Sequence, residues 1–225
     1  MREVVLDTET TGLDPLAGHR LVEIGCVELV NMVATGRSLQ LYLNPEMLMP
    51  AEAYKVHGLS DEFLADKPLF ADRVDALIEF LGDAQLVIHN AQFDLGFINA
   101  ELVRAGRLKL TNEYVDTVSL ARRKFPGQRA SLDALCERFN IDNTKRTKHG
   151  ALLDSELLAE VYLELSGGRQ HDLGLAPEMA PTSFSELMAI KRPVRPARPH
   201  AASESERAAH AEFLKKVTNP IWLKE

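Results

Sequence analysis

The sequence predicts an α/β domain in which a mixed β-sheet is flanked by helices. Three strand-like segments come first, and segments with helical spacing then alternate with short buried strands. That order of elements indicates a mixed sheet with helices packed against it. With 225 residues, of which 45% are hydrophobic and 26% charged, the chain is long enough to bury a core and is not wholly disordered.

Each element is predicted from its apolar pattern. Residues 3–7 contain a short buried run, residues 38–43 alternate apolar with polar side chains, and residues 151–165 carry leucines and a valine at helical spacing. The predicted strands are residues 3–7, 21–29, 38–43, 85–89 and 114–116. The predicted helices are residues 69–81, 93–105, 132–139, 151–165 and, near the C-terminus, 204–217.

The C-terminal part of the chain differs from the rest in composition. Five prolines follow Gly167 and Gly168 within a short stretch. Residues 1–166 carry 17 basic and 26 acidic residues, whereas residues 191–225 carry eight basic and four acidic ones. We therefore expect a folded domain at residues 1–168, a flexible Pro-rich linker at 169–202 and a C-terminal docking segment at 203–225.

Charge and cysteine content bear on the class of protein. The net charge of −7 argues against a protein that coats duplex nucleic acid electrostatically, but it does not exclude an enzyme whose acids hold metal ions. The N-terminus lacks the apolar core of a signal peptide, and no apolar run is long enough to cross a bilayer. Cys26 and Cys136 fit neither a disulfide framework nor a zinc pattern. We expect a cytoplasmic protein with reduced thiols and no membrane partner.

Acidic residues occur where predicted strands end and helices begin. Asp7 and Glu9 lie two apart at the end of the first strand, so their side chains share a face. Two carboxylates on one face favour a cation between them. The alternative is that Asp7 or Thr8 caps a turn closed by Gly12. Asp94 lies in the first turn of a helix, where the helix dipole alone would favour an acid.

A third acidic position lies in the helix at residues 151–165. Asp154 borders its apolar stripe, and an ionised acid there is costly unless it is paired or liganded. His149 lies in the polar loop just before this helix, where a single histidine is usually solvated. Together with the three other acids, Asp154 completes a set of hard oxygen ligands that suits Mg²⁺ or Mn²⁺ better than zinc, and His149 adds a base.

The motifs that contain these residues resemble a known family. They are Asp7-Thr-Glu9-Thr-Thr-Gly, His-Asn-Ala-Gln-Phe-Asp94 and His149-x4-Asp154. The pattern resembles the DEDDh family of 3′–5′ exonucleases, which have a ribonuclease H-like fold. A tyrosine branch of that family places Tyr four residues before the last Asp, whereas His149 stands five before it. Segments that begin at His19, Val56, Phe125 and Asp142 further resemble the proofreading epsilon subunits of bacterial DNA polymerase III, over about residues 2–168 and again at the C-terminus.

The resemblance implies an activity and its cofactors. We expect a metal-dependent 3′–5′ exodeoxyribonuclease, a hydrolase and subunit of a DNA-directed DNA polymerase, that removes misincorporated 3′-terminal nucleotides as 5′-monophosphates. It would use two divalent cations, Mg²⁺ or Mn²⁺. By resemblance, Asp7 bridges both cations, Glu9 and Asp154 complete one site, and Asp94 supports the other. His149 would deprotonate the attacking water.

The resemblance also implies contacts with the terminal nucleotide. Glu52 and His57 are expected to bind substrate, Glu52 through the 3′-hydroxyl, together with the metal-binding Asp7, Glu9 and Asp154. Without the family, His57 would equally be part of a turn before a helix at Ser60. The substrate is expected to be the single-stranded 3′ end of DNA.

Two C-terminal motifs suggest protein partners. Gln170, Leu173 and Leu175 resemble the short peptide that binds the bacterial sliding clamp, although a chance match in a linker is an equal alternative. Trp222, the single tryptophan, is adjacent to apolar residues near the C-terminus, which favours a partner surface over a frayed end. The resemblance points to the polymerase III catalytic (alpha) subunit in the replisome, and a small accessory subunit is a further possible partner.

Two other functions fit parts of the sequence. An RNA-trimming or free-standing DNA exonuclease, such as ribonuclease T or oligoribonuclease, would share the acidic residues but generally lacks the linker and the Trp-bearing tail. A non-catalytic tether between clamp and polymerase would need the tail but not the five residues of the acidic site.

Overall fold

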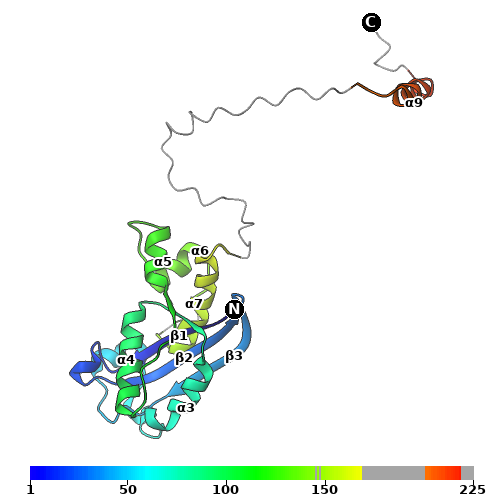
Figure 1. The fold of residues 1–225 in the computed structure, drawn as a ribbon. Coiled ribbons are helices and arrows are strands. Elements are labelled where there is room, and N and C mark those ends of the chain that lie inside the picture. Colours follow the sequence, from blue (N-terminus) through cyan, green and yellow to red (C-terminus); the bar gives the residue numbers. More distant parts are fainter. Residues whose placement is uncertain (145, 147, 169–200, 219–225) are drawn as a thin grey trace, which may run out of the picture. The chain divides into compact units, whose positions relative to one another are not determined.

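The computed structural model describes residues 1–144, 146, 148–168 and 201–218, which belong to two separate units (Figure 1). The first unit contains a β-sheet and its flanking helices. The second contributes the helix α9 (Glu204–Leu214), whose N-terminus is closed by a capping box between Ser203 and Glu206. In these ranges, each helix is either too short or too polar to cross a bilayer.

The sheet of the first unit is mixed, as predicted. Its strands are β1 (Arg2–Thr10), β2 (Leu21–Val30), β3 (Val33–Tyr42), β4 (Gln85–Ile88) and β5 (Tyr114–Asp116). They lie in the order β3-β2-β1-β4-β5. The three longer strands pair in antiparallel fashion, whereas β4 runs parallel to both β1 and β5. The carboxyl ends of β1, β4 and β5 therefore lie at the same edge of the sheet.

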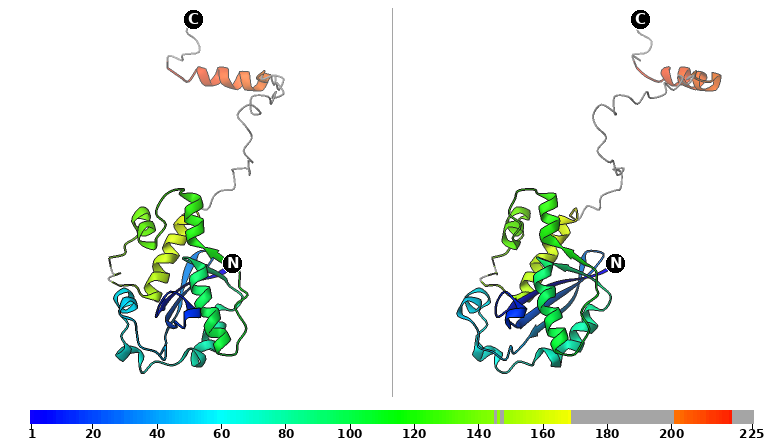
Figure 2. Two further views of the ribbon diagram at one scale, coloured as in Figure 1. Left: turned by 90° about the vertical axis from the view of Figure 1, so that its left-hand side faces the viewer. Right: turned by 60° about the vertical axis from the view of Figure 1, so that its left-hand side comes forward.

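Helices cover both faces of this sheet (Figure 2). One face packs against α3 (Phe70–Leu81) and α4 (Ala91–Arg104). The other packs against α5 (Thr117–Lys124), α6 (Leu132–Phe139) and α7 (Ala151–Leu165). The connections contain the short helices η1 (Pro15–Ala17), α1 (Ala51–His57) and α2 (Asp61–Leu64).

The alternation of side chains along β1 divides the apolar core into two parts. Val4 and Leu6 point to the core shared with α3 and α4, whereas Val5 points to the core shared with α7. All three side chains are fully buried. The central strand is thus fixed from both sides, and the residues that follow it are placed between the two helical layers.

Several boundaries and two helices differ from the predictions. Strand β1 continues to Thr10, because Glu9 and Thr10 pair with β2, and β3 begins at Val33 in an exposed polar segment. The helices α1 and α5 were not predicted, since both are short and bury few side chains. The helix α9 ends at Leu214 rather than 217. Cys26 and Cys136 are buried free thiols, as expected.

Candidate active site

Asp94 reaches the end of β1 because β4 and β1 run parallel. Leu6 of β1 lies opposite Ile88, the last residue of β4. Asn90 then adopts a left-handed conformation with φ of 71°, which asparagine tolerates better than most residues, and α4 begins at the next residue. Asp94 lies in the first turn, where its Oδ1 accepts a 2.7 Å hydrogen bond from the buried hydroxyl of Thr8.

Asp154 reaches the same place from the opposite face of the sheet. Gly25 of β2 lies opposite Asp7 of β1, and a Cβ atom at Gly25 would be 2.2 Å from the carbonyl carbon of Ala151. The absence of a side chain therefore lets the first turn of α7 rest directly on β2. Ser155 Oγ donates a 3.0 Å hydrogen bond to the Gly25 carbonyl, which fixes this contact. Asp154, the preceding residue, is thereby brought to Asp7 and Glu9.

Three of the four carboxyl groups resist ionisation. Burial, followed by the negative charges of Asp94, Glu9 and Asp154, raises the pKa of Asp7 well above its usual range. Burial and the charge of Asp154 raise the pKa of Glu9 to about 8. Burial raises the pKa of Asp94 to about 7, although the Thr8 hydrogen bond opposes this. A cluster of this kind is most stable with positive charge at its centre.

The pKa of Asp154 shifts in the opposite direction. Burial acts to raise it, but hydrogen bonds from Arg146 outweigh burial and hold the pKa below its usual value. Arg146 donates to both carboxylate oxygens, at 2.6 and 2.7 Å. A bidentate arginine contact of this kind is among the strongest that a carboxylate makes.

His149 lies at the open side of the acidic group. Its ring nitrogen and the carboxylate oxygens of Glu9 and Asp154 lie within 4.8 Å of one another. The His149 side chain is 47% exposed, so the ring borders solvent. Its backbone N–H donates a 3.2 Å hydrogen bond to the carbonyl of Val56, which joins this loop to α1.

A pocket of about 480 Å³ adjoins Glu9. Its walls include the segment after β1 and the helix α1, with Gly12, His19, Glu52 and His57 among the lining residues. Its volume lies within the range of small-molecule sites in proteins. The ring of His19 covers Gly12, where a Cβ atom would be 2.4 Å from it. A mononucleotide unit is of a size that such a pocket can hold.

His57 is one of the buried polar residues that line this pocket. Its Nδ1 accepts a 3.0 Å hydrogen bond from the Leu59 N–H, so the neutral ring carries its proton on Nε2. The Thr10 backbone lies near the ring and acts to raise its pKa. Even so, Nε2 makes no hydrogen bond of good geometry to any described residue. Burial lowers the pKa of His57, and the ring is therefore a neutral donor without a partner.

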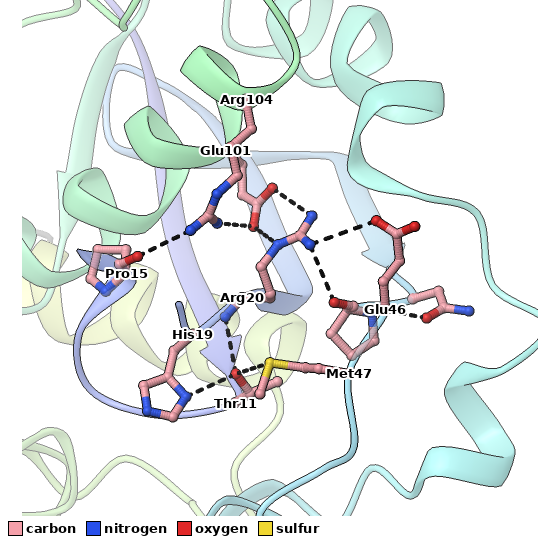
Figure 3. A network of polar contacts seen from close by, with 10 residues as sticks. Thr11, Pro15, His19, Arg20, Glu46, Met47, Glu101 and Arg104 are labelled. Carbon is pink, nitrogen blue, oxygen red and sulfur yellow. Dashed lines mark hydrogen bonds and ion pairs between the residues drawn. The ribbon is translucent and has the colours of Figure 1, made fainter. Parts of the chain in front are cut away.

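A partly buried ion pair holds the segment after β1 in place (Figure 3). Arg20 contacts both oxygens of Glu101 at 2.5 and 3.1 Å, and Glu101 lies on α4, two turns beyond Asp94. The Arg20 backbone N–H donates to the Thr11 hydroxyl at 3.0 Å, and the same hydroxyl contacts His19 at 3.2 Å. The wall of the pocket is thus tied to the helix that carries Asp94.

The structure brings together the acidic residues that the sequence singled out. Asp7, Glu9, Asp94 and Asp154 interact electrostatically, with His149 beside them and with Glu52 and His57 in the adjoining pocket. Hard oxygen donors that raise one another's pKa fit divalent cations. Four predicted partner contacts, Gln170, Leu173, Leu175 and Trp222, lie outside the described residues.

Sequence reasoning missed three residues of this site. Arg146 was one of several basic residues before His149, and the need of the acids for positive charge was the signal that could have identified it. Gly25 is an isolated glycine within a strand, a pattern that often marks a close backbone approach. Nothing in the sequence pattern distinguished Thr8 from the other threonines beside it.

The comparisons with known proteins agree on one family. Residues 4–162 match the sequence profile of the Exonuclease family. The chain is 47% identical to the DNA polymerase III subunit epsilon of Rickettsia felis, covering 96% of this chain and 97% of that protein. It is 46% identical to the protein of the same name from Escherichia coli, covering 98% of this chain and 97% of the relative.

Solved structures give the same fold. Exonuclease X in complex with 5′ overhanging duplex DNA superposes with a TM-score of 0.56 at 25% identity, over 73% of this chain and 90% of that chain. The nuclease domain of 3′hExo, a DEDDh family member bound to rAMP, superposes with a TM-score of 0.64 at 17% identity, over 76% of this chain and 94% of that chain. The chain therefore belongs to the Exonuclease family and, within it, to the DNA polymerase III epsilon subunits.

Proposed function

We propose that this chain is the proofreading exonuclease of a bacterial replicative DNA polymerase. It hydrolyses the terminal phosphodiester of a misincorporated 3′ nucleotide and releases a nucleoside 5′-monophosphate. The observation that carries the proposal is the convergence of four carboxyl groups and one histidine beside a pocket of about 480 Å³, in a chain of the Exonuclease family.

The four carboxylates are proposed to hold two divalent cations, Mg²⁺ or Mn²⁺. Asp7 contributes to both sites, Glu9 and Asp154 to one of them, and Asp94 to the other. When bound, such a pair of cations activates water and stabilises the attacking and leaving oxygens of an in-line displacement. The raised pKa values of Asp7, Glu9 and Asp94 support this assignment, because burial disfavours the ionised forms of these acids and a divalent cation would stabilise them.

His149 is proposed as the general base. Its ring borders both the acidic group and solvent, so it can accept a proton from a water molecule and pass it to bulk water. The Val56 hydrogen bond fixes the backbone of this residue.

The adjoining pocket is proposed to bind the terminal nucleotide. Glu52, exposed at the pocket wall, would accept a hydrogen bond from the 3′-hydroxyl, and the unpartnered Nε2–H of His57 would donate one to a substrate oxygen. His57→Ala is expected to raise KM more than it lowers kcat, because His57 would contact the bound nucleotide without taking part in the chemical step.

The C-terminal region is proposed to deliver the single-stranded 3′ end. The catalytic domain is assigned to residues 1–168, a linker with the clamp-binding residues Gln170, Leu173 and Leu175 to 169–202, and the segment that binds the polymerase catalytic (alpha) subunit, through Trp222, to 203–225. Trp222→Ala should abolish co-purification with the polymerase subunit; unchanged recovery would contradict the docking role. Gln170→Ala tests the clamp contact in the same way.

One digestion experiment tests the proposed activity. A primer with a 3′ mismatch is incubated with the chain and Mg²⁺, as DNA and as RNA, with and without the polymerase subunit. We expect 5′-monophosphates to be released from DNA, faster in the presence of the polymerase subunit, and chelation to stop the reaction. Faster digestion of RNA would favour an RNA-trimming enzyme, and no digestion at all would favour a tether.

The general base is tested by substitution. His149→Ala should lower kcat by about 10²–10⁴-fold while Mn²⁺ binding is retained, because the metal ligands are intact. Asp7→Ala should abolish both Mn²⁺ binding and turnover, since that residue contacts both proposed cation sites. Near-normal turnover of His149→Ala would refute the assignment of the base.

A further inference from the structure

Arg146 is a basic residue at the edge of the acidic site, and its guanidinium group contacts three side chains at once. Its Nε and Nη2 donate to the two oxygens of Asp154 at 2.6 and 2.7 Å. Its Nη1 donates to Asp133 Oδ1 at 2.6 Å, and its Nη2 lies 2.7 Å from His149 Nδ1. The Arg146 side chain is only 7% exposed, so its charge is held within the protein.

These contacts give the carboxylate group a permanent positive charge. A guanidinium group does not lose its proton in proteins, and its planar fork matches the carboxylate of Asp154. The charge of Arg146 also opposes the rise in the pKa of Asp7 and Glu9. It therefore neutralises the same acids that a divalent cation would neutralise.

The same contact determines the state of His149. The Nδ1 of His149 lies 2.7 Å from Arg146 Nη2 and 3.3 Å from Asp154 Oδ2. Arginine has no acceptor, so in the shorter of these two contacts Nδ1 accepts a hydrogen bond. In that arrangement the proton of the neutral ring is on Nε2, and the Nδ1 lone pair is engaged. A histidine whose lone pair is engaged by Arg146 cannot use that nitrogen to take a proton from water.

We propose that Arg146 is a built-in counter-cation that a divalent cation displaces from Asp154, and that this displacement frees His149 Nδ1 for the attacking water. The inference rests on the proposed function, because it concerns the cation site assigned above. Arg146 is a positioning residue in this scheme, since it acts through Asp154 and His149 and not on the substrate.

Charge and geometry support an exchange rather than permanent sharing. A divalent cation at the same distance from Asp154 interacts with it twice as strongly as a guanidinium group, before the costs of dehydration. Asp133 gives Arg146 a second partner outside the acidic group, because its side chain is 61% exposed at the start of α6. The arginine can therefore leave Asp154 and keep one ion pair.

The experiment compares four full-length proteins: the wild type, Arg146→Gln, Arg146→Lys and the control Arg123→Gln. The control removes one positive charge from an exposed position on α5. Mn²⁺ binding is measured by calorimetry, and the Tm is measured with chelator and with Mn²⁺. We expect Arg146→Gln to bind one Mn²⁺ roughly tenfold tighter than the wild type, a gain of about 1.4 kcal/mol.

A second readout follows His149 directly. In chelator, the ¹⁵N chemical shift of His149 Nδ1 should differ between wild type and Arg146→Gln, and Mg²⁺ should move the wild-type signal toward that of the variant. The Tm in chelator should fall for Arg146→Gln and recover with Mn²⁺, whereas Arg146→Lys should be intermediate and Arg123→Gln should match the wild type.

Three results bear on the proposal in different ways. Equal or weaker Mn²⁺ binding by Arg146→Gln would overturn the displacement while leaving the proposed function intact. A His149 signal in the wild type that Mg²⁺ does not move would overturn the link to the base. A wild type that binds no Mn²⁺ would overturn the proposed function and this inference with it.

Discussion

Two helices deliver an aspartate to the acidic site in the same manner but hold it in different ways. Asp94 is the fourth residue of α4 and Asp154 is the fourth residue of α7, and the two helices lie on opposite faces of the sheet. Asp94 accepts a hydrogen bond from the neutral hydroxyl of Thr8, whereas Asp154 is paired with the Arg146 guanidinium.

Because of this difference, the pKa values of the two carboxyl groups shift in opposite directions. Burial raises the pKa of Asp94 to about 7, while Arg146 keeps the pKa of Asp154 below its usual value. Position in a helix therefore does not decide the charge of an aspartate. The group that faces it does, and Asp154 is ionised at neutral pH before any cation binds.

The largest expected effect comes from removing the charge of each aspartate in turn. In chelator at pH 8, Asp154→Asn should lower the free energy of unfolding by about 3 kcal/mol, because it leaves the buried Arg146 without its main partner. Asp94→Asn should be neutral or stabilising, because it removes an acid that burial disfavours. Both should lose nuclease activity. Equal destabilisation by the two substitutions, measured by denaturant unfolding, would contradict the comparison.

The contact between α7 and β2 gives the next largest effect. Gly25→Ala places a Cβ atom 2.2 Å from the Ala151 backbone, so the first turn of α7 must move. We expect a loss of about 1–3 kcal/mol in stability and, through displaced Asp154, at least about 10² in kcat. Gly96→Ala is the matched control, since a Cβ there meets nothing within 4 Å. If both variants behave alike in thermal unfolding and turnover assays, the close approach at Gly25 is unimportant.

The raised pKa values predict how stability depends on pH without metal. The folded protein retains protons on Glu9 up to pH about 8 and on Asp94 up to about 7, where the unfolded chain would have released them near 4.5 and 3.8. Because the folded state binds more protons, stability in chelator should fall as pH rises from about 5 to 8. We expect the Tm to decrease by several degrees, and saturating Mg²⁺ to remove most of the decrease. A Tm that rises over this range would contradict the shifts.

The smallest expected effect is at the hydrogen bond between Thr8 and Asp94. Thr8→Val removes the 2.7 Å bond and should cost about 0.5–1.5 kcal/mol, with a further rise in the pKa of Asp94. Weaker Mn²⁺ binding near pH 7 should follow, because more of Asp94 is protonated. Thr8→Ser keeps the hydroxyl and should restore the wild-type affinity in calorimetry. An unchanged affinity in Thr8→Val would show that this bond does not tune the site.

The sequence could predict the elements whose apolar pattern is strong. The helices at 132–139 and 151–165 were predicted to the residue, because each has a buried face with helical spacing. The mixed sheet followed from the order of strands and helices. The end of β1 could not be found in this way, since Glu9 and Thr10 are polar and extend the strand by pairing with β2.

The candidate site was predictable in its acids but not in their surroundings. Asp7, Glu9 and Asp94 occupy strand ends and helix starts that a sequence pattern reveals. The partner of each acid depends on which segments meet in three dimensions: Arg146 precedes α7 and Thr8 lies on β1, and neither pairing follows from sequence spacing. The difference between Asp94 and Asp154 was therefore beyond sequence reasoning.

The single backbone hydrogen bond from His149 to Val56 has a consequence for the timing of the reaction. Val56 belongs to α1, the same short helix that presents Glu52 and His57 to the pocket. If an incoming nucleotide displaced α1, this bond would carry the movement to the backbone of the proposed base. Substrate recognition and proton removal would then be mechanically linked, and a poorly seated nucleotide would also misplace His149.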